Sequence, residues 1–542
     1  METLTINRIG AQGDGIADTP NGPVFASFTL PGERVEGVVV DGRLEQARIL
    51  TPSADRLTPD SPHYGDCGGC SLQHWASGPY LDWKREQVRL ALAREGIETE
   101  IDAAVATPPG ARRRVALHAR KGADGRVALG FKARRSWRLV EINACPVADP
   151  RIVQAIPTLK AIASVLFEHP KSAPTLHATW TLSGLDVDVT GVERRSGGLS
   201  ADAQARAVAA AYRGDLARLS IAGDTLVMSR QPEIGFGRAV VPLPAGGFLQ
   251  AAAQAEEALV SRSVAAVKGA RKIADLFCGA GTFTFPLAEI APVIAVDASE
   301  AGIAALKRGI KSAKGLKSIS AEARDLFRRP LTPFDLKGCD AIVFDPPRAG
   351  AVEQTAQIAD TKAASVVGVS CNPQTFARDA STLIKAGFSL DRVTPVDQFL
   401  WSTHVELPMT PDLDSTDDDS GGFDADDWTR LTPFTGAVAT LDDVQAKRAI
   451  FALSETDDPR PIVMDLPQPV IWWDEAGEQA AVAVQAESHL GSDGEEMKVL
   501  GLILPDGEGA VALLEDVDLV DDTDPTWRDL VTKAIDPSVL DD

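Results

Sequence analysis

The sequence is poor in several features that define whole classes of protein. Its 542 residues include 6 cysteines, which are too few for a disulfide framework and so exclude a small secreted scaffold. No uncharged apolar run approaches the roughly 18 residues that a membrane-spanning helix needs. The first residues, from Met1 to Thr5, lack the basic and apolar regions of a signal peptide. We therefore expect a cytoplasmic monomer that makes no contact with a membrane.

Basic residues are scarce at the end of the chain. Residues 411–542 carry 33 acidic and 7 basic residues, whereas residues 1–410 carry 44 acidic and 47 basic ones. The net charge of −23 therefore combines a slightly basic body with a strongly acidic tail. A basic body can bind nucleic acid, which would repel the tail.

Turn residues and charge divide the chain into five parts. Residues 1–57 alternate strand-like runs with Gly, Pro and Asp, which predicts a small β-barrel. A central α/β part covers 58–247, and strands alternate with helices over 248–409, which predicts an α/β fold with a parallel sheet. Eight aspartates between 412 and 427 indicate an acidic linker at 410–430. Residues 431–542 regain strand-like runs and predict an acidic β-rich domain without a catalytic pattern.

Three apolar runs in the third part end in residues that can carry chemistry. The run from Ile273 leads into a glycine loop, the run from Ile342 ends at Asp345 before Pro-Pro-Arg, and the run ending at Ser370 is followed by Cys371. In an open parallel sheet, ligands bind at these carboxyl ends of strands. Cys371 is therefore the candidate nucleophile.

The glycine loop predicts a nucleotide-type cofactor. Two glycines let the backbone approach a ligand, and Asp297, at the end of the next strand, can bridge two ribose hydroxyls. A dinucleotide fold stays open, but the G-x-G spacing favours S-adenosylmethionine, as in class I methyltransferases. The candidate cofactor residues are Phe277, Gly279, Gly281, Thr282, Asp297, Asp325 and Asp345.

Residues 112–138 are the most basic stretch, with ten Lys and Arg residues against Asp124 alone. The pattern alternates like a hairpin whose turn is at Gly122–Gly125. A solvated face is the usual meaning of a charge run, but such faces mix signs, so RNA contact is favoured. Trp137 can stack on a base. The candidate RNA-binding residues are Arg112, Arg113, Arg114, Arg120, Lys121, Arg134 and Arg135.

A Cys-Gly-Gly-Cys motif places Cys67 and Cys70 close enough to bind one metal or cluster. Cys145, before Pro146, is a candidate third ligand. Two reduced thiols in a tight turn are the alternative.

Residues 1–408 resemble the RNA uracil-5-methyltransferases, in particular the 23S rRNA type with an N-terminal TRAM domain. The resemblance rests on C-G-G-C, the glycine loop, D-P-P-R at 345–348, S-C-N-P at 370–373 and H-V-E at 404–406. It implies a Rossmann-like class I methyltransferase domain behind a TRAM or OB-like barrel, with S-adenosylmethionine as methyl donor. It also implies that Cys371 adds to carbon 6 of uracil, that Glu406 removes the carbon-5 proton, and that Gln250 contacts the cofactor.

The family pattern also implies a [4Fe-4S] cluster held by C-x5-C-G-G-C and a distant Cys-Pro. Ser61 stands at the first ligand position, so the fourth bond would come from Ser61 or another group. The cluster motif favours ribosomal RNA over transfer RNA as the partner. Three alternatives stay open: a transfer RNA substrate, methylation of an exocyclic base nitrogen, and a non-catalytic RNA-binding or assembly factor.

Overall fold

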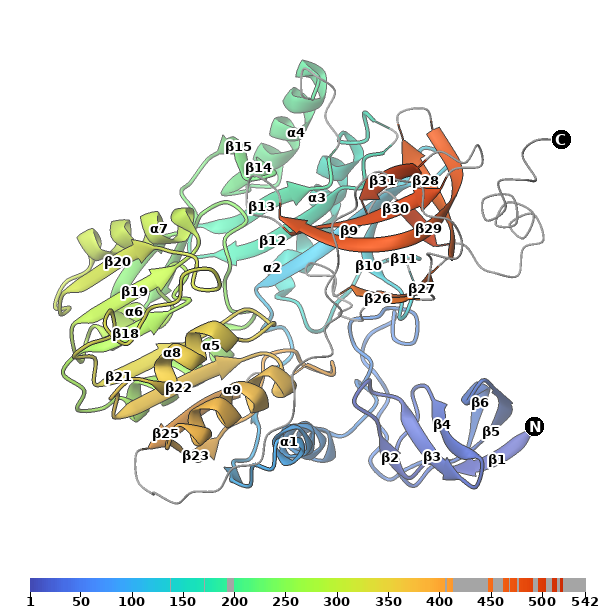
Figure 1. Cartoon of the computed structure of the whole chain (residues 1–542). Helices are drawn as coiled ribbons and strands as arrows, with labels where there is room; N and C mark the ends of the chain where they lie inside the picture. The colour runs from blue at the N-terminus through green and yellow to red at the C-terminus, as the bar shows by residue number, and fades with distance from the viewer. Residues whose placement is uncertain are drawn as a thin grey trace. The chain divides into compact units, whose positions relative to one another are not determined.

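The computed structural model describes residues 1–136, 138–169, 171–192 and 199–404, together with the backbone of the strands that follow up to residue 519 (Figure 1). The chain divides into two compact units, Met1–Asp417 and Asp418–Asp542.

The N-terminal part is a six-stranded sheet in the order β1-β5-β6-β4-β3-β2. Paired strands are antiparallel except for β4 and β6, which are parallel. Alternating apolar residues such as Val24, Ala26 and Val35 are buried in its core, as expected for strands with one wet face. The strands are β1 (Glu2–Thr5), β2 (Arg8–Ile9), β3 (Gly15–Thr19), β4 (Gly22–Ala26), β5 (Arg34–Val40) and β6 (Arg43–Thr51).

The central part is a seven-stranded sheet in the order β11-β10-β9-β12-β13-β14-β15. Leu159 of α3 and Ala207 of α4 pack with Leu117 and Leu176 of the sheet in one apolar core. Strands β9 and β10 form the predicted basic hairpin, paired from Val127 with Lys121 onward. The elements are β9 (Arg114–Lys121), β10 (Val127–Lys132), β11 (Leu139–Glu141), α2 (Pro150–Gln154), α3 (Ile156–Ser164), β12 (Thr175–Thr181), β13 (Gly184–Thr190), α4 (Ala201–Arg213), β14 (Arg218–Ile221), β15 (Asp224–Met228) and the separate hairpin β16 (Glu233–Phe236) and β17 (Ala239–Pro242).

The third part is an eight-stranded sheet in the order β20-β19-β18-β21-β22-β25-β23-β7. Its first five strands are parallel, and β25 runs antiparallel to both of its neighbours. The elements are α5 (Ala253–Ala266), β18 (Ile273–Leu276), α6 (Thr284–Leu287), β19 (Val293–Asp297), α7 (Glu300–Ser312), β20 (Ile319–Ala323), β21 (Ala341–Phe344), α8 (Val352–Ala359), β22 (Ser365–Ser370), α9 (Pro373–Lys385), β23 (Ser389–Val393), β24 (Val396–Asp397) and β25 (Leu407–Asp412).

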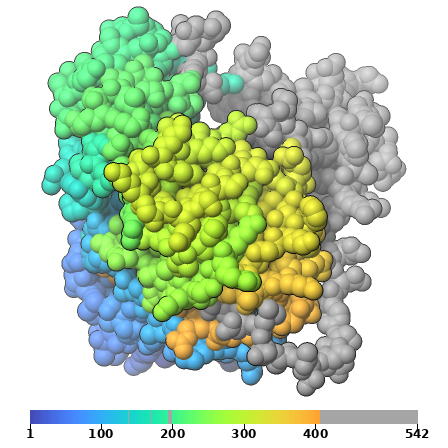
Figure 2. Space-filling model, turned by 90° about the vertical axis from the view of Figure 1, so that its left-hand side faces the viewer, coloured from blue at the N-terminus to red at the C-terminus, as the bar shows by residue number. Residues whose placement is uncertain are grey.

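Helices cover both faces of this sheet because its central strands are apolar on both sides. Val343 points into a core shared with α5, α6 and α7, whereas Ile342 and Phe344 point into a core shared with α8 and α9. Residues of this part, light green to orange, occupy the middle of the face in Figure 2. The arrangement confirms the predicted α/β fold class.

The boundaries of the third part differ from those predicted. Helix α1 (Ser77–Arg94) precedes the central sheet, yet its Val88 and Leu92 lie in the core on the α8–α9 side of the eight-stranded sheet. Strand β7 (Glu100–Ile101) pairs with β23, and β8 (Val105–Ala106) pairs with β24. At the other end, β25 continues to Asp412, past the boundary predicted at 409. The central sheet is thus inserted into a domain that starts before it.

The second unit contains strands in the acidic tail. A five-stranded sheet has the order β31-β30-β29-β28-β32, and β26 pairs with β27. Strands β27 to β31 overlap strand-like runs of the sequence. The linker was predicted at 410–430, but residues 410–412 belong to β25, and residues 413–430 lie outside the described residues. The strands of this unit are β26 (Lys447–Phe451), β27 (Ile462–Leu466), β28 (Gln468–Asp474), β29 (Gly477–Leu490), β30 (Glu496–Ile503), β31 (Gly509–Leu513) and β32 (Val517–Leu519).

Candidate active site

Three loops meet at the carboxyl edge of the eight-stranded sheet. Strand β21 lies between β18 and β22, and the three strands are parallel, so the glycine loop, Asp345 and Cys371 follow neighbouring strands at one edge. The chain continues from β18 towards β19 on one side and from β21 towards β22 on the other. This reversal is the switch point at which open α/β sheets bind ligands.

The glycine loop after β18 has an unusual backbone. Gly279 has a φ of +53°, and a β-carbon there would meet no atom within 4 Å, so its outer side is open. Gly281 has a φ of +108°, and a β-carbon there would lie 2.6 Å from the ring of Phe285. Phe277 adopts a φ of 60° although it is not a glycine, which costs of order 1–3 kcal/mol and is typical of functional sites. Thr282 follows directly in the same loop.

Three carboxyl groups, Asp275, Asp297 and Asp345, lie beside this loop. Burial raises the pKa of each, and the charges of neighbouring carboxylates also raise those of Asp275 and Asp345, which come to about 8 and about 7. Asp297 accepts hydrogen bonds from the N–H groups of Gly279, at 2.9 Å, and Ser299, at 2.7 Å. Because a cation would relieve the repulsion between these carboxyl groups, the site favours a positively charged ligand.

A chain of side-chain amides fixes the orientation of Gln250. The Gln250 amide donates to Asp345 at 3.0 Å, while its carbonyl accepts from the amide of Gln398 at 2.9 Å. Gln398 in turn accepts from the N–H of Ala251 at 3.1 Å. Both glutamines are buried. Gln250 thus lies against the group of carboxyls, where the resemblance implies a cofactor contact.

Asp325, after β20, lies close to the glycine loop. Its carboxylate accepts hydrogen bonds from the N–H groups of Phe327, at 2.9 Å, and Arg328, at 3.3 Å. The rings of Phe327 and Phe277 are 5.5 Å apart. The sequence-predicted residues Phe277, Asp297, Asp325 and Asp345 therefore surround one edge of the sheet.

Cys371 directly follows β22 and is separated from the start of α9 by Asn372, and it is half-buried. Asn372 caps α9 by accepting from the N–H of Gln374 at 3.0 Å. The Arg348 carbonyl accepts from the side chains of Asn372 and Thr375, at 3.5 and 3.3 Å, which fastens the Asp345–Arg348 loop beside Cys371. The N-terminal end of a helix carries partial positive charge, which favours a thiolate.

The two rival cysteines do not suit the role of nucleophile. Cys278 and Cys339 are both buried. Burial raises the pKa of both thiols, and the charges of Asp275 and Asp297 raise that of Cys278 further. Both therefore stay protonated, as expected for structural cysteines. Glu406 lies outside the described residues, and the last described residue before it is His404, whose ring lies 5.8 Å from that of Phe399.

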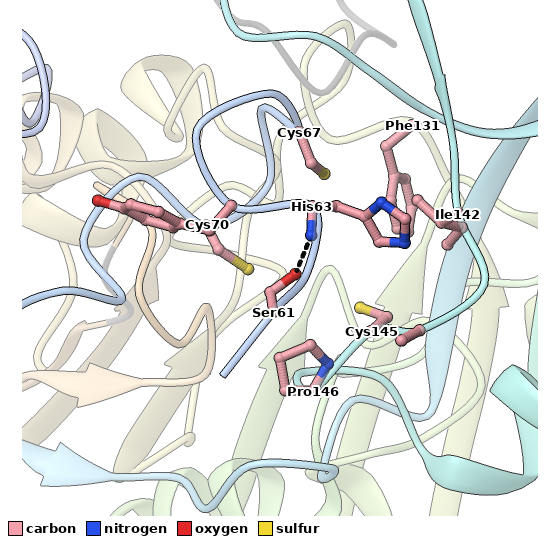
Figure 3. Close-up of a pocket in the computed structure, with 10 residues that line it drawn as sticks. Ser61, His63, Cys67, Cys70, Phe131, Ile142, Cys145 and Pro146 are labelled. Carbon is pink, nitrogen blue, oxygen red and sulfur yellow. Dashed lines mark hydrogen bonds between the residues drawn. The ribbon is translucent and has the colours of Figure 1, made fainter. Parts of the chain in front are cut away.

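The cysteines of the C-G-G-C motif line a separate pocket in the central part. Cys67, Cys70 and Cys145 line it together with Ser61 and His63 (Figure 3). Burial raises the pKa of Cys70, as do the thiols of Cys145 and Cys67, while Arg112 lowers it. Among the described residues, no group of three or more His, Cys, Asp or Glu side chains is arranged to hold a metal ion. The iron–sulfur cluster therefore stays a prediction.

Comparisons with known proteins identify the family. A profile of the tRNA (Uracil-5-)-methyltransferase family matches residues 238–410. An uncharacterized RNA methyltransferase of Caulobacter vibrioides is 60% identical over 409 residues, which are 75% of this chain and 99% of that protein. The 23S rRNA (uracil(1939)-C(5))-methyltransferase RlmD of Chromohalobacter salexigens is 31% identical over 74% of this chain and 87% of its own. The chain belongs to the RNA uracil-5-methyltransferase family.

A solved structure shows the same fold. The tRNA (uracil-54, C5)-methyltransferase of Pyrococcus abyssi, in complex with S-adenosyl-L-homocysteine, matches with a TM-score of 0.59 and 23% identity over 76% of this chain and 100% of that one. These comparisons confirm the predicted fold class, the enzyme class and S-adenosylmethionine as the methyl donor. None of the described helices is long and apolar enough to cross a membrane.

The predicted RNA-binding residues of this methyltransferase fall into distinct environments. Arg134 and Arg135 both pair with Asp14 of the N-terminal sheet, whose side chain is 3% exposed. Arg43 pairs with the same carboxylate at 2.8 Å, and Arg134 also lies 5.0 Å from the ring of Phe28. We call these residues, Asp14 with Arg43, Arg134 and Arg135, the Asp14 cluster. It joins the N-terminal sheet to the loop that follows the basic hairpin.

Arg113 is likewise engaged within the chain. It pairs with Glu256 of α5 at 2.6 Å, with side chains 14% and 12% exposed, and donates to the Gln250 carbonyl at 3.1 Å. The remaining candidates have other positions. Arg112 lies over the ring of Phe399 at 5.7 Å, Arg114 lies over Phe248 at 5.8 Å, and Arg120 and Lys121 are exposed at the far end of β9. Trp137 lies outside the described residues.

Sequence reasoning missed three residues of the site. Gln398 holds Gln250, Asp275 lies among the carboxyls, and Lys84 of α1 bonds the segment before His404. A signal existed for Asp275, because it is a carboxylate inside an apolar strand and such groups are rarely buried without a role. Gln398 and Lys84 gave none, since their partners lie 148 and more than 300 residues away in the chain.

Proposed function

We propose that this enzyme forms 5-methyluridine in 23S rRNA through a covalent bond between Cys371 and carbon 6 of the target uracil. The observation that carries the proposal is the position of Cys371. It follows β22, directly beside the Asp345 loop, at the edge of the sheet that also holds the glycine loop. A nucleophile and a methyl donor can therefore meet one base there.

The reaction needs this arrangement because carbon 5 of uracil is a poor nucleophile. The Cys371 thiolate forms a bond to carbon 6, and the electron pair of the C5=C6 bond moves towards carbon 5 and the neighbouring carbonyl. S-adenosylmethionine supplies an electrophilic methyl group that carbon 5 attacks, so the sulfonium leaves as a neutral thioether. Glu406 then accepts the carbon-5 proton. The electron pair released re-forms the C5=C6 bond, and the bond from carbon 6 to sulfur breaks to return the thiolate.

The carboxyl groups of the site bind the cofactor in this proposal. Asp297 engages the ribose hydroxyls, and Asp345 and Gln250 face the positively charged methionine end. Asp325, beside the ring of Phe327, contacts the adenine part, and the N–H groups of the loop at Gly279 and Gly281 approach the ligand. These roles follow the family pattern residue by residue, and the grouping of the side chains supports them.

In this proposal, RNA approaches the site along the surface that carries Arg112 and Arg114. Phe248, which is 63% exposed, lies next to Arg114 and offers a ring on which an unstacked base can rest. Arg120 and Lys121 add phosphate contacts from the hairpin. The target uridine must leave its stack to reach Cys371. We propose that the enzyme acts as a monomer in the cytoplasm.

Ribosomal RNA is favoured over transfer RNA by the relative named RlmD, at 31% identity. The family profile and the archaeal structure carry transfer RNA in their names, so the alternative has support of its own. Mapping 5-methyluridine in the ribosomal and transfer RNA of a deletion strain separates the two. Loss of the modification from transfer RNA alone would contradict the ribosomal assignment.

We also propose that Cys67, Cys70 and Cys145 hold a [4Fe-4S] cluster, with Ser61 at the fourth position. In such a cluster each thiolate binds a different iron, which requires wider spacing than one metal ion does. Three thiols around one pocket suit that requirement. Protein purified without air should be brown and lose its broad absorption in air. Colourless, iron-free protein would leave the cysteines as structural thiols.

The covalent mechanism is tested by two substitutions that should fail differently. Cys371→Ala should abolish both turnover and any covalent bond to RNA, because no enolate forms. Glu406→Gln should permit attack and methyl transfer and then stall, because an amide does not accept the proton. The expected result is a denaturation-resistant protein–RNA adduct that carries labelled methyl. If Cys371→Ala retains activity, the proposed mechanism is wrong.

A further inference from the structure

Residues 346–351 form a loop, here named the Pro-Pro loop, that leads from the end of β21 to α8. It contacts the first two turns of α9, the helix that begins two residues after Cys371. Side chains of α9 bond three backbone groups of the loop, namely the carbonyls of Arg348 and Ala349 and the N–H of Ala351. Because backbone groups of a loop lack the partners that a helix or sheet supplies, these bonds fix the loop against the start of α9.

Arg378 and Asp379 of α9 make two of these bonds as one unit, here named the clasp. The Arg378 guanidinium donates to the carbonyl of Ala349 at 3.0 Å and to Oδ1 of Asp379 at 2.9 and 3.1 Å. The other oxygen, Oδ2 of Asp379, accepts from the N–H of Ala351 at 2.8 Å. The Asp379 side chain is only 6% exposed, and a carboxylate so deeply buried needs bonds to both of its oxygens. Its charge therefore holds the guanidinium and the loop in one arrangement.

Gly350 of the loop allows the clasp to close. It has a φ of +80°, and a β-carbon there would collide with Nη2 of Arg378 and lie 2.7 Å from Oδ2 of Asp379. The next neighbour, the β-carbon of Thr375, would be 3.0 Å away. The two closest atoms are ends of side chains, so they can be pushed aside while the backbone of α9 stays helical. One methyl group at residue 350 is therefore enough to open the clasp.

The clasp lies between the strands that carry the two sides of the site. Asp379 lines a small pocket together with Phe344, the last residue of β21, and Ser370, the last residue of β22. The next residues along the chain are Asp345 and Cys371. A shift of α9 against the Pro-Pro loop therefore changes the position of the thiol relative to the cofactor side of the site.

The two sides differ in how they are anchored. Asp345 has anchors of its own, because its N–H donates to the carbonyl of Leu276 at 3.2 Å and its carboxylate accepts from Gln250. Cys371 lies where the sheet gives way to the helix, since β22 pairs with β25 up to the residue before it and α9 starts just after it. The sheet thus holds one side of Cys371, and α9, fastened by the clasp, holds the other.

We propose that Arg378 and Asp379 are positioning residues for the nucleophile, because they hold the start of α9 where the Cys371 thiolate can reach carbon 6 of the target base. The inference rests on the covalent mechanism proposed above. A misplacement of about 1 Å costs on the order of a hundredfold in rate when reacting groups must be aligned. Cofactor binding requires no alignment with Cys371. Opening the clasp should therefore slow the addition to carbon 6 and leave the affinity for the cofactor unchanged.

The test compares Gly350→Ala with Gly338→Ala. Gly338 also has a φ of +80°, precedes β21 in the same sheet, and a β-carbon there would meet no atom within 4 Å. Both substitutions therefore strain the backbone alike, and only Gly350→Ala opens the clasp. The substrate is an RNA that the wild-type enzyme methylates, transcribed with 5-fluorouridine in place of uridine. Fluorine on carbon 5 cannot leave as a proton, so the methylated adduct is trapped and its rate of formation can be followed on a denaturing gel.

At saturating RNA and S-adenosylmethionine, we expect Gly350→Ala to form the adduct at least about tenfold more slowly than the wild type. Its affinity for S-adenosyl-L-homocysteine in calorimetry should stay at the wild-type value. Gly338→Ala should match the wild type in both measurements. A loss of stability alone would affect the two glycine variants equally, so the difference between them reports the clasp.

A second variant keeps the inference testable if Gly350→Ala does not fold. Asp379→Asn retains an acceptor for the loop but loses the charge that holds Arg378, so it should slow adduct formation to a smaller extent. Its matched control is Asp186→Asn, because Asp186 and Arg218 form a buried pair in the central sheet with side chains 5% and 6% exposed. This control should form the adduct at the wild-type rate.

The inference is overturned if the folded Gly350 and Asp379 variants form the adduct as fast as their controls. It is also overturned if their affinity for S-adenosyl-L-homocysteine falls as much as their rate of adduct formation, because the clasp would then act on the cofactor. If the wild-type enzyme forms no adduct with the fluorinated RNA, the covalent mechanism itself is wrong and the inference fails with it.

Discussion

Replacing residues of the Asp14 cluster separates the arginines that serve the fold from those that serve RNA. The Asp14 carboxylate is 3% exposed and bonds three guanidinium groups, of which Arg134 is 12%, Arg135 24% and Arg43 43% exposed. Removing one partner of a fully buried pair costs about 3–5 kcal/mol. Since two of these three arginines can regain water, we expect Asp14→Asn to cost about 2 kcal/mol of unfolding free energy.

Two double substitutions, one in the Asp14 cluster and one at the exposed end of β9, should change different properties of the protein. Arg134→Ala with Arg135→Ala should lower the urea midpoint of unfolding, because Asp14 is left buried with Arg43 alone. Arg120→Ala with Lys121→Ala should leave the midpoint unchanged, because both side chains are exposed. Binding to single-stranded RNA should weaken instead, and the slope of log affinity against log salt should fall by about 0.7 for each lost phosphate contact.

The assay is therefore a pair of measurements on each variant: urea unfolding of the free protein, and RNA affinity at several salt concentrations. A loss of about 1.4 in the salt slope is expected for the Arg120 and Lys121 double variant alone. The reasoning is refuted if the Arg134 and Arg135 double variant loses that slope while its stability stays at the wild-type value. In that case the Asp14 cluster would open to release its arginines to RNA.

Three further predictions follow from the fold and the site. Truncation after Asp417, which keeps β25 whole, should change the rate of methyl transfer to a short RNA by less than about tenfold, or ~1.4 kcal/mol in the barrier. A larger loss in a folded protein would show that the acidic unit takes part in the reaction. In the folded protein Asp275 keeps its proton up to a pKa of about 8, whereas the unfolded chain releases it near 3.8. The contribution of this group to stability is therefore full below about pH 4 and is lost as the pH rises to 8. Asp275→Asn should gain stability relative to wild type between pH 5 and 8 in urea melts, and parallel pH profiles would contradict the raised pKa of Asp275. Binding of S-adenosylmethionine should tighten as Asp345 ionises through a pKa of about 7. In calorimetry at pH 6 and 8, its affinity should rise more than the affinity of the uncharged thioether product. Equal increases would mean that Asp345 does not face the sulfonium.

The sequence could place the candidate groups of the site at one edge of a sheet because each of them sits in a local pattern. The glycine loop, Asp345 and Cys371 each follow a short apolar run, and parallel strands bring their carboxyl ends together. The hairpin of β9 and β10 was equally local, since its alternation and its Gly-rich turn lie within one stretch. Such features need no knowledge of what lies far away in the chain.

The contacts that the sequence did not predict share the opposite property. The ten basic residues of 112–138 predicted one RNA-binding surface, but Arg113 meets Glu256 143 residues later and Arg134 meets Asp14 120 residues earlier. A run of basic residues in the sequence does not show which carboxylates the fold places beside it. Likewise, nothing local shows that α1 packs on the far sheet, so sequence patterns could not join α1 to the third part of the chain.

The insertion of the central sheet explains why distant residues control the site. Helix α1 and strands β7 and β8 precede that sheet, yet they join the eight-stranded sheet that carries Cys371. Phe399 and Trp401, which follow β24, are accordingly bonded by Lys84 and Tyr80 of α1, from the start of the same domain. The part of the chain that carries Cys145 and the basic hairpin is thus connected at both ends to the domain that carries Cys371. Substitutions in α1 should accordingly be read as changes to the active site rather than to a separate RNA-binding module.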